Sequence, residues 1–313
     1  MTAATVLLTG AGFVHPEPGG AEPWFDPVPH LGARGWRYLT PATRYVLAAA
    51  GLAMSDAGFH PGSLADEDVG VAIGTNFAAA PVVARFDRIV ADEGADAISP
   101  AEAPAFSVNI PASQISMRHG LRAFNLTLTN PMVAGLEAVL TMRSALLRGR
   151  ARAGIAGAVE ERPADTAAEA IGAGAAGEGA CCVVLERADD AAPRTGPEVA
   201  GGFSVFAAPG LDPVALLGAR LDALLAGATG PLPYAPPAGS FRLRDQVDDA
   251  CRSWAKQAGI ELLEAELTGA DGRDFTVSPL LQLAGLAAAP AGGLVLAASP
   301  HGHVAAVLLR PPA

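Results

Sequence analysis

The sequence has few cysteines, few basic residues and no long apolar run, and each shortage excludes a class of protein or of binding partner. It has 3 cysteines in 313 residues, too few for the disulfide framework of a small secreted protein. Cys181 and Cys182 are adjacent within an apolar run, which predicts a buried strand. Cys251 lies at helical spacing between Val247 and Trp254, which predicts a core position. These thiols indicate a reduced, cytoplasmic protein.

Lysine and arginine number 21 against 32 acidic residues, and the formal net charge is −11. This charge argues against nucleic acid and anionic membranes as partners. Mean hydropathy is +0.31, but no apolar run reaches the roughly 18 residues that a membrane-spanning helix needs. The opening MTAATVLLTGAG lacks the basic segment and the long apolar stretch of a secretory signal. We therefore expect no nucleic acid and no membrane among the partners.

Cofactor and metal motifs are also missing. The GAG at residues 10–12 suggests a dinucleotide-binding turn, but His15 stands where G-x-G-x-x-G needs its third glycine, and no helix follows. His301 and His303 form an H-x-H pair without a third ligand, which a turn between two strands explains more simply than a metal site. The sequence has no G-x-S-x-G, H-E-x-x-H or Walker A motif. We expect neither a cofactor nor a metal.

Apolar runs and helical patterns alternate along the chain. Strands are predicted in TVLLTGAG, which should end in a glycine turn, and in DVGVAIGT, ARAGIAGAVE and GEGACCVVLE. A helix is predicted in TPATRYVLAAAGLAMSDAG, with Thr40 as its cap, Pro41 in its first position and Gly58 at its end.

The same order begins again after a predicted linker at residues 188–198. A strand in EVAGGFSVFAAPG, a helix in LDPVALLGARLDALLAG and a Pro- and Gly-rich break at 229–239 come first. A helix leading into a strand and a closing pair of strands follow. This alternation predicts an α/β layered fold, with one unit at 1–187 and a second at 199–313.

The stretch NLTLTNPMVAGLEAVL, from Asn125 to Leu140, has the layout by which many enzymes present a nucleophile. An alternating segment meets a break at Asn130-Pro131, and a helical pattern follows with Gly135 in its first turn. The amides and the dipole at such a helix start stabilise an anion. The residue at the tip is Met132, whose thioether can be neither deprotonated nor acylated.

In order and spacing, these segments resemble beta-ketoacyl synthases of the thiolase fold. VLLTGAGFVHPEPG resembles the family's opening strand and turn, and TRYVLAAAGLAMSDAG its first long helix. DVGVAIGT, SPAEAPAFSVNIPASQISMRHGLRAFN, AGIAGAVE and GEGACCVVLE follow. The resemblance covers most of residues 1–187, and the chain is shorter than the family after 188. It implies an αβαβα layered fold of two related halves, the second one shortened.

The residues on which condensation depends in that family are absent. Its nucleophilic cysteine lies three residues before a glycine at this turn, and counting back from Gly135 leads to Met132. The region of the first catalytic histidine reads LTGADGRDF. That of the second, TVSPLLQLAGLAAA, has neither the Gly-His pair nor the preceding lysine. Malonyl decarboxylation and enolate stabilisation by the family's two histidines are thus not available here.

This profile resembles the chain-length factor, the non-condensing partner of a type II polyketide ketosynthase. The resemblance implies a heterodimer with a catalytic ketosynthase, to which this chain lends one wall of the acyl tunnel. The strand Asn125–Thr129 would then pair across the dimer axis. Acyl carrier protein, itself acidic, would dock mainly on the partner. The residues expected at the tunnel or the partner interface are Glu102, Phe106, Asn109, Gln114, Met117, Asn125, Thr127 and Thr129.

Other interpretations stay open. A thiolase-fold acyltransferase or hydrolase with a non-standard site would need a nucleophile, for which Thr127, Thr129 and a loop residue, Ser113, are candidates without a recognisable histidine base. A solitary acyl-binding protein is a third possibility, and the shortened second half suggests a short, highly reduced or polyene product. The apolar residues near the expected tunnel also fit an ordinary core role: Phe106, Val108, Ile115 and Met117.

Overall fold

The computed structural model describes residues 5–17, 20, 23–60, 62, 64–163, 177–188, 195–208, 212–228, 230–239, 241–267 and 275–311. Its strands follow the order β3-β2-β4-β5-β1-β6-β10-β9-β7-β8. The first five are β1 (Val6–Val14), β2 (Val69–Gly74), β3 (Asn125–Leu128), β4 (Ala153–Glu160) and β5 (Gly179–Arg187). The second five are β6 (Glu198–Phe206), β7 (Leu232–Ala235), β8 (Leu262–Glu264), β9 (Gly293–Ala298) and β10 (His303–Arg310).

The second set of strands repeats the order of the first. β8-β7-β9-β10-β6 matches β3-β2-β4-β5-β1 strand for strand. In each set the first pairings are parallel, from β3 through β2 to β4 and from β8 through β7 to β9, and the later ones are antiparallel. A single residue pair, Leu7 with Glu198, connects β1 to β6.

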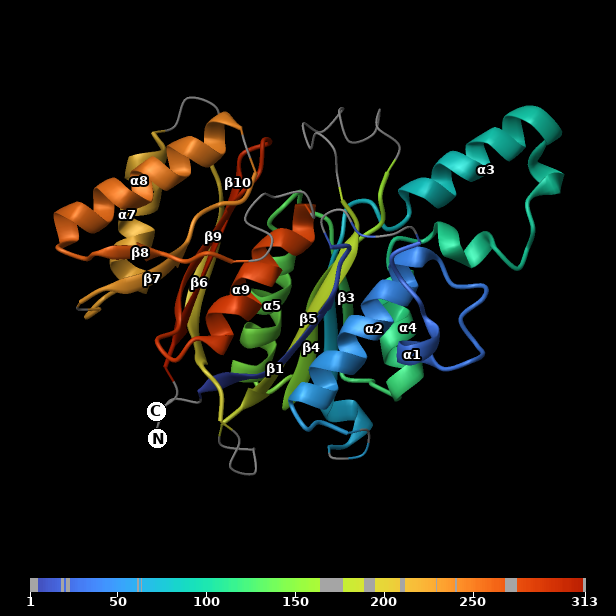
Figure 1. The fold of residues 1–313 in the computed structure, drawn as a ribbon, viewed down its shortest axis with the longest axis horizontal. Coiled ribbons are helices and arrows are strands. Elements are labelled where there is room, and N and C mark those ends of the chain that lie inside the picture. Colours follow the sequence, from blue (N-terminus) through green and yellow to red (C-terminus); the bar gives the residue numbers. More distant parts are fainter. Residues whose placement is uncertain are drawn as a thin grey trace.

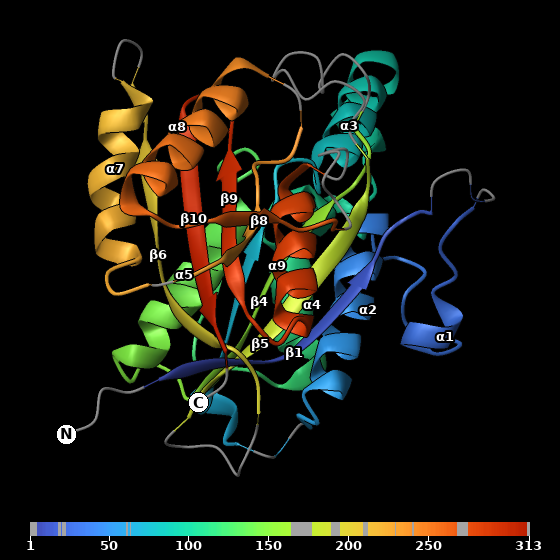
Figure 2. The same ribbon diagram turned by 60° about the vertical axis from the view of Figure 1, so that its left-hand side comes forward.

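Because one residue pair alone links them, we call the first set of strands the first sheet and the second set the second sheet. Helices cover the outer face of each sheet and lie between the two (Figure 1). The helices α2 (Pro41–Asp56) and α4 (Ile110–His119), with the short α1 (Val28–Leu31), lie on the outer face of the first sheet. The second sheet carries α7 (Pro213–Leu224) and α8 (Arg242–Ala258) on its outer face, where α8 crosses β10 and β9 (Figure 2). Between the sheets lie α5 (Ala134–Leu147) and α9 (Ser278–Ala288). These layers confirm the predicted α/β layered fold.

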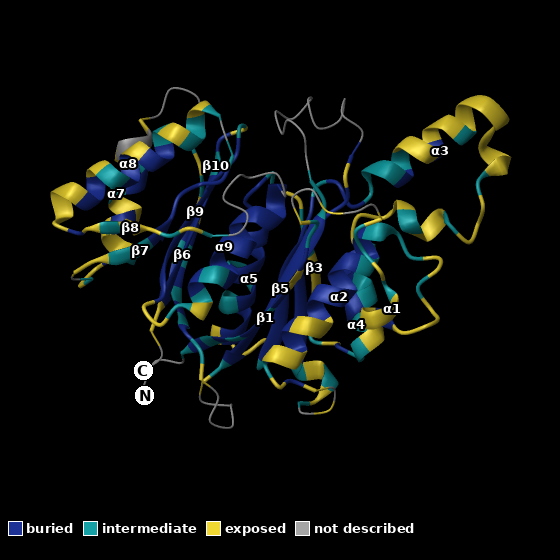
Figure 3. Ribbon diagram, in the orientation of Figure 1, coloured by how far each residue is buried: buried dark blue, intermediate teal, exposed yellow. Residues whose placement is uncertain are grey.

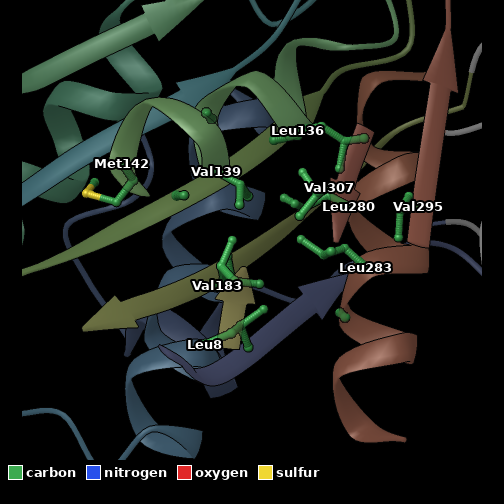
Figure 4. Close-up of a cluster of buried hydrophobic side chains, with 14 of the residues drawn as sticks. Leu8, Leu136, Val139, Met142, Val183, Leu280, Leu283, Val295 and Val307 are labelled. Atoms are coloured by element: carbon green, nitrogen blue, oxygen red, sulfur yellow. The ribbon is translucent and has the colours of Figure 1, made fainter. Parts of the chain in front are cut away.

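The middle layer is the main core of the molecule. Apolar side chains of α5 and α9 meet those of strands from both sheets (Figure 4). Most of each middle helix is buried, shown dark blue in Figure 3, whereas α3 (Ala80–Glu93), which projects from the layers, is mostly exposed. Arg143 of α5 also ties the two sets together, because its Nε donates to Val199 O at 2.7 Å and its Nη2 to Ala200 O at 2.6 Å, both on β6.

The first strand does not end in the predicted glycine turn. β1 continues through Gly10 and Gly12 to Val14, and Gly12 pairs with Cys182 of β5. The glycines are needed for close packing instead. A Cβ on Gly12 would lie 2.3 Å from Ala53 N, and one on Gly10 would lie 2.4 Å from Ala57 N. Two glycines in this strand therefore let α2 pack directly against the sheet.

Of the other local predictions, the helix cap is confirmed, whereas one strand and one helix were not predicted. Thr40 caps α2 as predicted, since its Oγ1 accepts a hydrogen bond from Thr43 N at 3.3 Å, and the helix ends at Asp56, before Gly58. The predicted break at 229–239 contains the strand β7, and α3 was not predicted. β5 ends at Arg187 and β6 begins at Glu198, while residues 189–194 of the predicted linker lie outside the described residues. Of the helices that the structure describes, none has the length and apolar character needed to cross a bilayer.

Candidate functional site

The turn between β3 and α5 holds its tip residue in a strained backbone conformation. Met132 has a φ of +59°, a left-handed value that costs a residue with a side chain about 1–2 kcal/mol. Two hydrogen bonds fix the turn: Val133 N donates to Pro131 O at 2.7 Å, and Ala134 N donates to Asn130 O at 3.0 Å. Because α5 begins at Ala134, the N-terminal end of that helix, which carries a partial positive charge, follows Met132 directly.

The Met132 side chain is buried, with 4% of its surface exposed. It packs with Phe77, which follows β2, and with Phe275, the first residue of the short helix η4 (Phe275–Val277). The centroids of the two phenylalanine rings lie 5.1 Å apart. We refer to Phe77, Met132 and Phe275 as the apolar plug. The tip of the turn therefore presents a thioether and two aromatic rings, with no ionisable group among them.

The plug joins equivalent turns of the two strand sets. Phe275 precedes α9 as Met132 precedes α5, and it has a φ of +50°. Among the described residues, these two alone combine a side chain with a positive φ. Each half thus contributes one strained residue to the same apolar cluster.

A buried carboxyl group fastens residues 75–77, which follow β2, to η4 of the second half. Glu160, at the end of β4, accepts hydrogen bonds from Phe77 N at 2.7 Å and Asn76 N at 3.0 Å. Thr75 Oγ1 donates to it at 3.3 Å, and Asn76 Nδ2 donates to Thr276 Oγ1 at 3.0 Å. Burial raises the pKa of Glu160 to about 7, against the opposing effect of the hydrogen bonds that it accepts. Because Glu160 is fully buried and hydrogen-bonded within the fold, it acts as a clamp between segments.

A second buried carboxylate anchors the Met132 turn to the other sheet. Asn130 Nδ2 donates to both oxygens of Glu137, at 2.9 and 2.7 Å. Ser204 Oγ of β6 donates to Glu137 Oε1 at 2.6 Å. The backbone at the turn is therefore held from both halves of the molecule.

The cysteine thiols and Ser113 do not supply a nucleophile at this turn. The three cysteines are buried, as predicted, and burial raises the pKa of each thiol, that of Cys251 to about 12. They are protonated at neutral pH and poor nucleophiles. Ser113 lies in the first turn of α4 and not on a loop, because the helix already begins at Ile110. In the ranges that the structure covers, no group of three His, Cys, Asp or Glu residues could hold a metal.

The predicted tunnel and interface residues fall on three neighbouring elements and not on the apolar plug. Glu102 precedes the short helix η3 (Ala103–Phe106) and pairs with Arg85 at 2.9 Å. Phe106 stacks on Phe86 of α3, with ring centroids 6.2 Å apart. Asn109, Gln114 and Met117 lie at the start and along α4.

The remaining predicted residues lie on or beside the edge strand β3. Asn125 Nδ2 donates to Ser116 Oγ of α4 at 2.7 Å, which joins the strand to that helix. Thr127 Oγ1 is buried without a hydrogen-bond partner in the described part of the chain. Thr129 is exposed just beyond the strand. Six of the eight residues thus lie on α4, on β3 or directly beside them, and these are Asn109, Gln114, Met117, Asn125, Thr127 and Thr129.

Solvent exposure overturns the core interpretation for three of the four apolar residues named with them. Ile115 is fully buried, whereas Phe106 is 55%, Val108 37% and Met117 64% exposed. The helical spacing of α4 distinguishes its buried face from its outer face, and Met117 belongs to the outer one. An apolar side chain at such a position is available for contact with another molecule.

Sequence reasoning missed Phe77, Phe275 and Glu160. Phe275 is the last residue of the LTGADGRDF region, most of which lies outside the described residues, and Glu160 ends the predicted strand AGIAGAVE. No local pattern distinguishes these residues from ordinary strand and loop positions. Their proximity to Met132 depends on the contact between the two halves.

A family model and curated relatives match the first part of the chain. Residues 11–171 match the model described as beta-ketoacyl synthase, N-terminal domain. Over 143 residues the chain is 31% identical to 3-oxoacyl-[acyl-carrier-protein] synthase 2 of Rhizobium meliloti (strain 1021), covering 45% of this chain and 32% of that protein. Over 177 residues it is 28% identical to the actinorhodin polyketide putative beta-ketoacyl synthase 2 of Streptomyces coelicolor, covering 46% of this chain and 44% of the relative. The alignments span less than half of either relative.

Similar solved structures extend over nearly the whole chain. The ishigamide ketosynthase/chain length factor aligns with a TM-score of 0.77 and 22% identity, covering 98% of this chain and 99% of that one. AntDE:AntF, a type II PKS acyl-carrier protein in complex with its ketosynthase bound to the hexaketide, aligns with a TM-score of 0.82 and 18% identity, covering 99% and 100%. At these identities the alignments show a shared fold.

Proposed function

Because the chain belongs to the beta-ketoacyl synthase family, we propose that it is a non-condensing subunit that pairs with a catalytic ketosynthase in type II polyketide biosynthesis. The observation that carries the proposal is the apolar plug. Met132 lies in the turn where the family resemblance expects the nucleophilic cysteine, and Phe77 and Phe275 pack against it. A thioether enclosed by two rings cannot carry an acyl chain as a thioester.

The surface around β3 supports a partner on that side of the molecule. β3 is the terminal strand of the sheet and pairs only with β2, so one edge of its backbone is free of strand partners in the described residues. Leu126 of β3 is 44% exposed, and Met117 of α4 is 64% exposed. An unpaired edge flanked by exposed apolar side chains favours extension of the sheet by another chain.

In this assignment the chain contributes shape and the partner contributes chemistry. The ketosynthase would hold the growing acyl chain and perform each condensation. Side chains of η3, α4 and β3 would line the interface and one wall of the tunnel, where a difference of a methylene or two is worth about 1–3 kcal/mol. Two similar solved structures support these partners: one is a ketosynthase/chain length factor, and the other is an acyl-carrier protein in complex with its ketosynthase. The net charge of −11 favours carrier docking mainly on the ketosynthase.

The variant Met132→Cys tests the proposal. It is assembled with a candidate ketosynthase whose own nucleophilic cysteine is changed to alanine, and elongated acyl product is measured. A thiol at the start of α5 can be acylated, but no His belongs to the plug or to its hydrogen-bonded clamp. We expect no elongation, and normal elongation when Met132→Cys is combined with the intact ketosynthase.

Elongation by the first combination would show that this chain holds a working acid–base set, and the non-condensing role would be wrong. Release of free acid from an acyl carrier by this chain alone would instead favour the hydrolase alternative. The matched control is Met142→Cys on α5, the helix that follows the turn; the Met142 side chain is fully buried in the middle-layer core and does not belong to the plug. It distinguishes effects of a thiol at the turn from effects of losing a buried methionine.

A further inference from the structure

A cavity of about 350 Å³ lies beside the N-terminus of α2. Segments that are distant in the sequence form its wall: residues 37–41 and Arg44, the first turns of α3, Glu102 and Ala105, and Glu161 after β4. It shares no lining residue with the apolar plug. Its volume is within the range of small-molecule sites, roughly 300–1,000 Å³.

Three guanidinium groups line this cavity, in a chain whose net charge is −11. Arg85 is paired with Glu102, and both side chains are partly exposed. Arg37 and Arg44 have no ion pair among the residues that the structure describes. Two of the three cationic side chains in this wall are therefore available to an anion.

Arg44 is held in position before any ligand binds. Its guanidinium lies over the Trp36 ring, 5.1 Å from the ring centroid. Its Nη2 donates to Arg37 O at 3.2 Å, and its Nε is buried without a hydrogen-bond partner in the described ranges. A guanidinium fixed in this way loses little conformational freedom when it binds an anion.

The other groups in the wall leave a positive balance. Three guanidinium groups face two carboxyls, those of Glu102 and Glu161. Glu161 Oε2 accepts a hydrogen bond from Ala42 N at 3.0 Å, and burial raises its pKa to about 7, so its negative charge is incomplete at neutral pH. The N-terminal end of the 16-residue helix α2 adds a further partial positive charge.

Apolar surface lies beside the charged part of the cavity. Leu39, Pro41 and Val82 line it, and Tyr38, with 86% of its surface exposed, stands at the same wall. We propose that the cavity binds a small organic anion, with its phosphate or carboxylate group among the three arginines and its apolar body against these neighbouring side chains. This site is independent of the function proposed for the Met132 turn.

The proposal is tested by titrating the full chain with phenyl phosphate, benzoate, inorganic phosphate and phenol in a calorimeter. We expect phenyl phosphate or benzoate to bind, and the tighter of the two identifies the charged group that the site prefers. Inorganic phosphate and phenol should bind at least about tenfold more weakly. Absence of binding by both organic anions at millimolar concentration would overturn the proposal. So would equal binding of phenol, because the arginines would then contribute nothing.

Charge-neutral variants locate the site. Arg37→Gln and Arg44→Gln should each weaken binding about tenfold or more, since each removes a charge-assisted hydrogen bond. Arg37 is exposed, and within the described ranges its side chain makes no hydrogen bond or ion pair, so its variant should fold normally even if Arg44→Gln does not. Arg88→Gln is the control, because Arg88 lies one turn beyond Arg85 on α3 and outside the cavity wall. Unchanged affinity in Arg37→Gln, or an equal loss in Arg88→Gln, would contradict the assignment.

Discussion

The two strand sets share one backbone plan and carry different side chains. Both have the same strand order, and both place a non-glycine residue with positive φ just before the middle helix. They differ at their outer edges. β3 is flanked by α4 with its exposed apolar Met117, whereas the equivalent strand β8 has three residues, Leu262–Glu264.

The comparison separates what the fold requires from what catalysis requires. A Cβ on Gly74 would lie 2.5 Å from the backbone of Ala134, and one on Gly135 would lie 2.8 Å from Thr276 O. This close packing around the turn fixes its path whatever residue stands at the tip. The left-handed conformation of Met132 is therefore maintained by the surrounding structure in a chain without the nucleophile.

A charge introduced on each of the two edge strands should reveal the largest difference between the two strand sets. Leu126 of β3 is 44% exposed and Leu263 of β8 is 45% exposed, at opposite ends of the strand order. Leu126→Asp should abolish association with the co-expressed ketosynthase, because a carboxylate would be buried in the interface, at a cost of several kcal/mol. Leu263→Asp should leave the complex intact. Size-exclusion chromatography with light scattering measures both, and equal behaviour of the two variants would place the partner elsewhere.

Glycine substitutions should change stability in opposite directions on the middle helix α5 and on the outer helices α2 and α7. Gly135→Ala should lower the free energy of unfolding by about 3 kcal/mol, because the new Cβ meets backbone of the second half. Gly51→Ala on α2 and Gly218→Ala on α7 meet nothing within 4 Å and should each raise it by about 0.5–1 kcal/mol. Urea unfolding measures all three. A neutral Gly135→Ala would show that the contact between the halves is loose.

The buried clamp between the halves should make stability depend on pH. The pKa of Glu160 is about 7 in the folded chain against 4.5 for an ordinary glutamate, so the folded state retains its proton to higher pH. The contribution of Glu160 to stability should therefore be fully present below about pH 4.5 and be lost as pH rises through 7. Between pH 5 and pH 8, the free energy of unfolding of Glu160→Gln should fall by about 2 kcal/mol less than that of the wild type. Urea unfolding across this range measures the difference, and parallel curves would contradict the raised pKa.

The smallest effect concerns the two strained residues. Glycine tolerates a positive φ, so Met132→Gly should be more stable than Met132→Ala by about 1 kcal/mol, and Phe275→Gly more stable than Phe275→Ala by a similar amount. The control is Ala138→Gly in the middle of α5, where the glycine variant should be less stable than the protein with alanine by about 1 kcal/mol. Thermal unfolding compares the pairs. The same order at all three positions would mean that the turns are unstrained in solution.

Local patterns were sufficient to predict the layered fold, because apolar strands, a capped helix and glycine spacing are visible within short windows. The family was predicted from the resemblance of these segments, in their order and spacing, to known members. They failed where packing overrides local preference. β7 lies in LPYA, next to prolines that normally disfavour strands, yet its residues Tyr234 and Ala235 are completely buried beside β9. β1 continues through glycines for the same reason, since α2 requires that space.

The candidate site shows the same limit. Met132 could be predicted because the turn, the helix and Gly135 are neighbours in sequence. Phe77 and Phe275 could not, because each comes from a segment with its own local role and meets Met132 only when the halves pack together. Periodicity predicts that a face of α4 is apolar, but it does not reveal whether Met117 meets this chain or another one.

The pairing of Glu198 has a consequence for how the chain could be rearranged. At the start of β6, this residue is paired with Leu7 of β1 and with Arg310 of β10, so the strands at which the two halves meet end beside one another. In Figure 1 the N and C markers are close together. A short linker from the end of β10 to the start of β1, with a new opening between β5 and β6, would yield a circularly permuted protein in which every strand keeps its present neighbours.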